Sequence, residues 1–230
     1  MKLIDFGTVG LLRIIAVLLC SLSASSVTGL AYSIELKEVR PNITRSQDGV
    51  LFLIKGKAGD QFVEIHTGGY RFKAPKDWKA GTESEKESFR PKLQADPRMP
   101  VTVLAMFVNR RESCLVVVYE THIDDGLPDN YLDTLQEQNI EKFRMGTAQG
   151  IVKQVFENRR ATLDVNGALL LDWEGVRGGM RRTRQWVLHL PTRSKDVVTV
   201  SGFCNDEGHA STKDTIDKIA ASVRDTEDKS

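Results

Sequence analysis

The sequence predicts an α+β fold in which an antiparallel β-sheet is covered by one internal and one C-terminal helix. Short segments of alternating apolar and polar residues recur from residue 33 onward. A stretch with helical spacing interrupts them near residues 132–146, and a second follows the last strand. Because strands and helices do not alternate one by one, a parallel sheet is excluded.

Residues 1–31 are predicted to be a cleavable signal peptide. Lys2 and Arg13 precede an apolar run that ends in small residues. That run lasts about nine residues, whereas a spanning helix needs roughly 20, so an uncleaved anchor is the less favoured alternative. Lipid attachment at Cys20 is also less favoured, because Leu19 is large where a lipobox carries a small residue. We therefore expect an exported protein, periplasmic or extracellular, with no integral membrane span after cleavage.

Charge is balanced over the chain, which has 32 basic and 31 acidic side chains. Such a balance gives no net field that would attract nucleic acid or an anionic membrane. We therefore expect no nucleic-acid partner. About 200 residues suit a single domain with an extension.

The segment after the signal peptide, residues 32–69, is predicted to be an N-terminal β-hairpin extension. Alternating runs at residues 34–39, 50–54 and 62–65 indicate strands, and Gly59 with Asp60 provides turn chemistry between the last two. A strand follows from Tyr70 and stops at Pro75, which lacks an amide hydrogen. Residues 79–100 are charged and contain three prolines, so we expect a mobile surface loop.

The centre of the chain supplies the predicted core. Residues 101–108 and 114–119 are dense in β-branched and apolar residues and indicate buried strands. A helix follows, with Leu132, Leu135, Ile140 and Phe143 expected on its buried side and Lys142 on the opposite side.

The C-terminal part is predicted to consist of strands and a closing helix. The strands are expected at residues 151–156, 161–165, 168–173, 183–190 and 197–203. Asn166 and Gly167 form a two-residue hairpin signal. A capping box beginning at Ser211 precedes the helix, and residues 226–230 form a charged tail.

Cys114 and Cys204 remain after signal cleavage, and an even number of cysteines in an oxidising compartment favours pairing. Each lies at the edge of a strand-like run. We predict a disulfide between them, and two buried free thiols are the alternative.

Three stretches together resemble the PsbP-like fold family, which includes bacterial secreted proteins. They are the aromatic strand with proline and tryptophan at residues 70–78, the hairpin pattern at residues 166–187, and the strand and closing helix at residues 197–224. The resemblance covers about residues 70–225 and implies an α/β/α sandwich. It also implies binding to proteins or stabilising assemblies, with no shared catalytic motif.

A cluster of basic residues is the candidate binding site. It lies between two predicted strands beside Trp186, and guanidinium groups can pair with carboxylates and stack on indole rings. As a binding site it would meet an acidic partner or lipid headgroups, whereas a solvated turn above two core tryptophans is the favoured interpretation. The cluster consists of Arg177, Arg181, Arg182 and Arg184.

Catalytic and metal-binding patterns are weak. Glu120, His122, Asp124 and Asp125 cluster at a strand end, but no paired-histidine motif accompanies them, so a polar strand end is favoured over a metal site. There is no nucleophile elbow and no phosphate loop. We expect neither metal nor cofactor.

The function expected from the sequence is that of an exported, non-catalytic binding or accessory protein of the bacterial envelope or periplasm. Its expected partner is an envelope protein or an acidic surface, whose identity the sequence leaves open together with the oligomeric state. A small secreted hydrolase or metal-dependent enzyme is the alternative.

Overall fold

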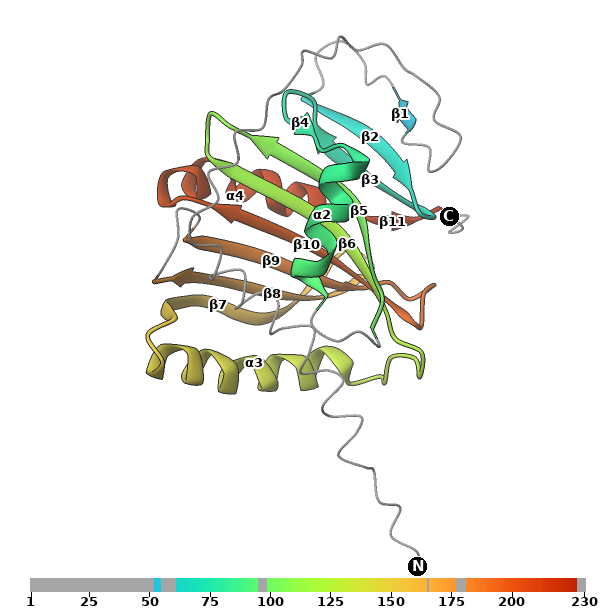
Figure 1. The fold of residues 1–230 in the computed structure, drawn as a ribbon. Coiled ribbons are helices and arrows are strands. Elements are labelled where there is room, and N and C mark those ends of the chain that lie inside the picture. Colours follow the sequence, from blue (N-terminus) through green and yellow to red (C-terminus); the bar gives the residue numbers. More distant parts are fainter. Residues whose placement is uncertain (1–51, 55–60, 95–98, 165, 177–180, 227–230) are drawn as a thin grey trace, which may run out of the picture.

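The computed structural model describes residues 52–54, 61–94, 99–164, 166–176 and 181–226. The predicted signal peptide, the strand at residues 34–39, the turn at Gly59 and Asp60, Arg177 and most of the charged tail lie outside the described residues. Within the described part, two antiparallel sheets and three helices are present (Figure 1). The predicted α+β class is confirmed.

The larger sheet has seven strands, and all neighbouring strands are antiparallel. Their spatial order is β4 (Lys79–Ala80), β5 (Val101–Asn109), β6 (Cys114–His122), β10 (Asp196–Cys204), β9 (Arg182–His189), β8 (Asn166–Gly175) and β7 (Val152–Leu163). The smaller sheet contains β1 (Phe52–Ile54), β2 (Phe62–Thr67), β3 (Tyr70–Pro75) and β11 (Arg224–Asp225). The N-terminal strands are therefore joined to the strand that starts at Tyr70.

Three layers result (Figure 1). The smaller sheet and α4 (Asp206–Ala221) cover one face of the larger sheet, where Phe72 and Ile216 share a core with Val116 and Leu170. The opposite face carries α2 (Glu83–Leu93) and α3 (Tyr131–Ala148), each over its own apolar cluster. Successive residues of each central strand face opposite layers, which explains why these strands are almost continuously apolar.

The predicted loop over residues 79–100 is wrong, because α2 lies inside it. Thr82 caps this helix: its side chain accepts from the Glu85 amide at 3.3 Å, and the Glu85 carboxylate accepts from the Thr82 amide at 2.6 Å. This reciprocal capping box is visible in the sequence. The prolines obscured it, although Pro91 stands in the last turn of the helix, so that only two helical residues lie beyond the bond that it removes.

The central helix is confirmed, but one of its predicted core residues is wrong. Leu132, Leu135 and Phe143 are buried, whereas Ile140 is 60% exposed and Lys142 is 7% exposed. Ile140 lies about 80° around the helix axis from Leu132 at 100° per residue. The buried stripe thus runs through Lys142, whose burial lowers its pKa to about 8.

Three predicted boundaries are also wrong. Where two strands were expected at residues 151–156 and 161–165, Val152–Leu163 form one strand, β7, with two register irregularities. The hairpin turn precedes Asn166, because Leu163 pairs with Asn166 and Asp164 adopts a positive φ of 59°. The last helix begins at Asp206, where the Asn205 side chain accepts from the Gly208 amide, instead of near Ser211.

The predicted disulfide is present. Cys114 and Cys204 face each other in register on β6 and β10, with an S–S distance of 2.02 Å and a Cα–Cα distance of 4.2 Å. Both are buried, and the Thr212 hydroxyl of α4 lies 3.4 Å from Cys114 Sγ. The bond therefore joins two central strands beneath the start of α4.

Candidate functional site

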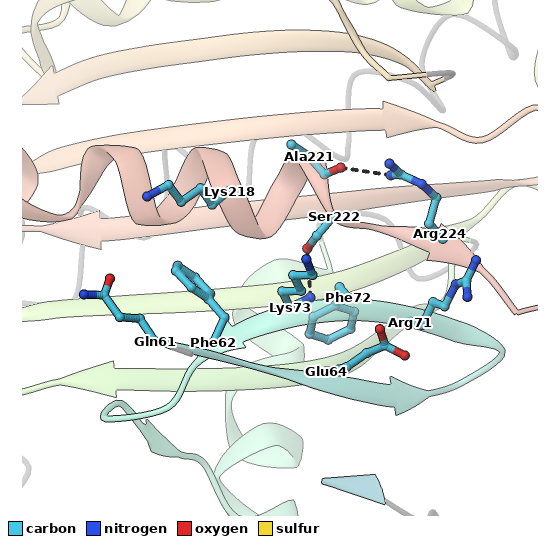
Figure 2. Close-up of a pocket in the computed structure, with 10 residues that line it drawn as sticks. All are labelled: Gln61, Phe62, Glu64, Arg71, Phe72, Lys73, Lys218, Ala221, Ser222 and Arg224. Atoms are coloured by element: carbon cyan, nitrogen blue, oxygen red, sulfur yellow. Dashed lines mark hydrogen bonds between the residues drawn. The ribbon is translucent and has the colours of Figure 1, made fainter. Parts of the chain in front are cut away.

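An open pocket of about 640 Å³ lies between the outer face of the smaller sheet and the C-terminal end of α4 (Figure 2). Strands β2 and β3 form one wall, and α4 with the start of β11 forms the other. The lining residues are Gln61, Phe62, Glu64, Arg71, Phe72, Lys73, Lys218, Ala221, Ser222 and Arg224.

The side chains of the strand wall alternate between buried and outward-facing positions, as they do along any β-strand. Val63 and Ile65 of β2 are buried, so Glu64 between them points outward. On β3, Arg71 and Lys73 point outward by the same rule. A two-residue turn joins the strands, in which Gly68 and Gly69 take positive φ values of 58° and 80°, as a tight hairpin turn requires.

The helix wall is held against β3 by one hydrogen bond between segments distant in sequence. The Lys73 amide donates to Ser222 Oγ at 2.8 Å, and Ser222 Oγ donates to the Ile219 carbonyl at 2.7 Å. Ser222 is the C-cap of α4. The end of the helix is therefore fixed at the pocket.

Arg224 has a structural part in this pocket. Its guanidinium donates to the carbonyls of Ala221 at 2.9 Å and Val223 at 2.7 Å, and also bonds Asp164. These bonds satisfy carbonyls that a helix end leaves open. Arg224 stands directly opposite Arg71 in the sheet, where like charges are destabilising.

Three further cations line the pocket, and none of them has an acidic partner in the part of the chain that the structure describes. Within the described residues, Arg71, Lys73 and Lys218 form no ion pair, and Lys218 lies 5.8 Å from the centre of the Phe62 ring. The pocket's one acid, Glu64, accepts a hydrogen bond from His66 at 2.7 Å. Among the described residues, the pocket therefore carries more positive than negative charge, with Glu64 opposite Lys73 in the sheet.

The predicted basic cluster is divided between surface and interior. Arg181 is exposed. Arg182 lies 3.1 Å from Asp172 and 3.3 Å from the centre of the Phe156 ring. Arg184 is buried, so the binding role stays a prediction that depends on Arg181 and Arg182.

Arg184 and Trp186 lie beneath α4. Arg184 is 3% exposed, and its guanidinium donates to Asp172 at 2.8 Å and to Asp217 at 2.7 and 2.8 Å. The Trp186 indole donates to Asp217 at 2.7 Å. Arg184, Trp186 and the buried Leu188 are spaced by two residues, so all three side chains lie on the same inward face of β9.

The acidic strand end at Glu120 forms hydrogen bonds within the protein. His122 Nδ1 lies 2.7 Å from Asp196 Oδ1, and its Nε2 lies 3.6 Å from Asp124. Burial, and then the neighbouring Asp196 carboxylate, raise the pKa of Glu120. Among the residues that the structure describes, no three His, Cys, Asp or Glu side chains are arranged to hold a metal ion.

The pocket was not predicted from the sequence. The glycine pair before Tyr70 and the outward positions of Arg71 and Lys73 are local signals for its strand wall. Lys218 and Ser222 lie about 150 residues away, and nothing local relates them to β3. None of the helices in the described part of the chain has the length and hydropathy that a membrane crossing needs.

Comparisons with known proteins give a similarity in structure alone. No family model matches the chain, and no curated protein matches it. Among solved structures, the cyanobacterial PsbP (CyanoP) of Synechocystis sp. PCC 6803 matches with 15% identity and a TM-score of 0.49, over 74% of this chain and 96% of that one.

A second structure is LpqN of Mycobacterium tuberculosis, described as involved in cell envelope biogenesis. It matches with 15% identity and a TM-score of 0.45, over 72% of this chain and 86% of that one. At these values neither match carries an argument about function.

Proposed function

We propose that this chain is an exported, non-catalytic binding or accessory protein of the bacterial envelope or periplasm, which holds an anionic group of a partner in the pocket between β2, β3 and α4. The observation that carries the proposal is the set of cations Arg71, Lys73 and Lys218, which share one pocket and form no ion pair within the described residues. A carboxylate there would offset the repulsion between Arg71 and Arg224.

The expected affinity is modest. Ion pairs at a solvent-exposed site contribute about 0.2–1 kcal/mol each. Three such pairs alone give a weak and reversible contact. That strength suits an accessory protein whose contact adds to others in an assembly.

Two observations support export. The order of charged, apolar and small residues in the first 31 positions is that of a signal peptide. The Cys114–Cys204 disulfide is of a kind that persists in oxidising compartments.

Export is tested by expressing the full chain in a bacterial host and measuring the intact mass of the protein in each fraction. We expect a periplasmic or secreted product that lacks about 31 residues and gains two hydrogens on reduction. A matched variant, Leu18→Arg, interrupts the apolar run and should retain the protein in the cytosol. A full-length cytosolic product of the unmodified chain contradicts the proposal.

The pocket is tested by titrating the exported protein with a glutamate tetrapeptide and following amide chemical shifts. Lys218→Glu should weaken binding several-fold and reduce its dependence on salt. Lys213→Glu is the control, because Lys213 is exposed on the same helix but does not line the pocket. Equal effects of the two variants would contradict the assignment of the pocket.

A further inference from the structure

A second pocket, of about 510 Å³, adjoins the first. The two share Gln61 and Phe62, so they meet at the start of β2. The second pocket lies along the N-terminal half of α4, with Asp77 and Trp78 after β3 on its other side.

One face of α4 runs through both pockets. Ser211 and Thr215 line the second pocket, and Lys218 and Ser222 line the first. Steps of four, three and four residues keep these side chains on a single helix face. Their span is about 16 Å at 1.5 Å per residue, which is about the length of five residues of extended chain.

The two ends of this groove differ in charge. The first pocket carries the cations Arg71, Lys73 and Lys218. The second contains Asp77 and Glu112 against Lys76. Glu112 accepts a hydrogen bond from Ser211 at 2.6 Å, whereas exposed Asp77 has no hydrogen bond or ion pair within the described residues.

We propose that the two pockets form one groove that holds an extended polypeptide segment of a partner, about five residues long. An acidic side chain of that segment lies against Lys73 and Lys218, and a basic side chain lies near Asp77. This inference rests on the proposed function, because it assigns the same basic pocket to one end of the ligand.

Charge and polarity favour a peptide over a polyanion. A phosphate chain would bring negative charge against Asp77 and Glu112. A peptide offers backbone amides to the Thr215 hydroxyl, which makes no hydrogen bond in the described part of the chain, and to the Gln61 amide. The Phe62 ring at the junction gives an apolar contact.

The test compares two five-residue peptides on the ¹⁵N-labelled exported protein. The first, the bipolar peptide, carries glutamates at one end and a lysine at the other. The second has glutamine in place of the lysine. We expect the bipolar peptide to bind about threefold more tightly, as one added exposed ion pair allows. It should also shift the amide resonances of Trp78 and Thr215.

Asp77→Lys should abolish the preference for the bipolar peptide, and Asp214→Lys, on the exposed side of α4, should leave it unchanged. Equal affinities for both peptides, with no shift of the Thr215 amide resonance, contradict the proposed peptide groove but not the proposed anion binding in the first pocket. If neither peptide binds, the proposed function itself fails. A linear inorganic polyphosphate that competes more strongly than the bipolar peptide also contradicts the inference.

Discussion

The guanidinium of Arg184 on β9 is joined to the Asp217 carboxylate of α4 by two hydrogen bonds, Nε to Oδ1 at 2.7 Å and Nη2 to Oδ2 at 2.8 Å. Asp217 precedes Lys218, which lines the basic pocket. The pair therefore fixes the helix that forms one wall of the pocket. Arg184 also bonds Asp172, so one buried cation connects β8, β9 and α4.

Removing Arg184 should destabilise the fold strongly. In Arg184→Met, the Asp172 carboxylate stays 3% exposed without its closest cation. Breaking a buried pair by removing one partner costs about 3–5 kcal/mol. Urea unfolding should show this loss, whereas Arg181→Met at an exposed site should change the free energy of unfolding by less than about 0.5 kcal/mol. Similar losses in both variants would contradict the network.

Asp172 should make the fold sensitive to acid. Burial alone would raise the pKa of Asp172, but the hydrogen bond and charge of His209, with Arg182 and Arg184, hold that pKa below its ordinary value. The folded state therefore releases this proton more readily than the unfolded chain, so the stabilisation is present above pH about 4 and is lost as pH falls through the lower folded pKa.

The measurement is the free energy of unfolding of wild type and Asp172→Asn between neutral pH and pH about 3. The variant should be less stable at neutral pH, and the difference should shrink below pH about 4. A difference that is constant with pH would show that the pKa of Asp172 is the same in the folded and unfolded states.

Glu120 should act with the opposite sign. Its pKa is raised by burial and by the Asp196 carboxylate, so the folded state holds its proton more tightly than the unfolded chain does. Stability from this group is therefore greatest below pH about 4 and falls as pH rises toward the folded pKa.

Glu120→Gln should accordingly stabilise the protein at neutral pH and have little effect in acid. Thermal unfolding at both pH values measures this, and Glu137→Gln on the exposed side of α3 is the control. A loss of stability at neutral pH would show that the Glu120 carboxylate is needed in its charged form.

The disulfide should contribute substantially to stability. It closes a loop with a sequence separation of 90 residues. In the chain-entropy model such a loop corresponds to about 4–5 kcal/mol. The double variant Cys114→Ala, Cys204→Ala should lose about that amount in urea unfolding. A loss that adding reductant to the wild type does not reproduce would indicate cavity formation as the cause.

Gly202 should be intolerant of a side chain because α4 packs directly on it. A Cβ at Gly202 would lie 2.3 Å from Ile216 Cδ1. Overpacking of this kind costs about 1–3 kcal/mol. Ile216→Val removes Cδ1, so the double variant should lose less stability than the sum of the two single variants. Strict additivity would mean that α4 shifts freely on β10.

Much of the fold could be predicted from local patterns. Runs of β-branched and apolar residues placed β5, β6, β9 and β10, and Cys114 and Cys204 were assigned to each other before their register was known. The errors arose where two local signals competed. The prolines favoured a loop over the helix that Thr82 caps, and the Asn166-Gly167 pair favoured a turn two residues after its actual position at Asp164. A helical apolar pattern likewise placed Ile140 in the core, although the sheet lies on the other side of Leu132.

The candidate site could not be predicted in the same way. Lys73 and Ser222 are 149 residues apart and meet only because α4 returns over the larger sheet to the edge of β3. A charged residue such as Arg184 is expected at the surface. In the structure it lies beneath α4, paired with Asp172 and Asp217.

The sequence by itself determined the strands and most of the helices, because apolar periodicity and helix caps depend on residues close together in the chain. It also determined the pairing of the cysteines, because only two remain after signal cleavage in an oxidising compartment. Tertiary structure alone decided which cations remain without acids, because ion pairing depends on distances between segments far apart in the chain. Arg184 is therefore part of the core, whereas Arg71, Lys73 and Lys218 line the pocket and form no ion pair within the described residues.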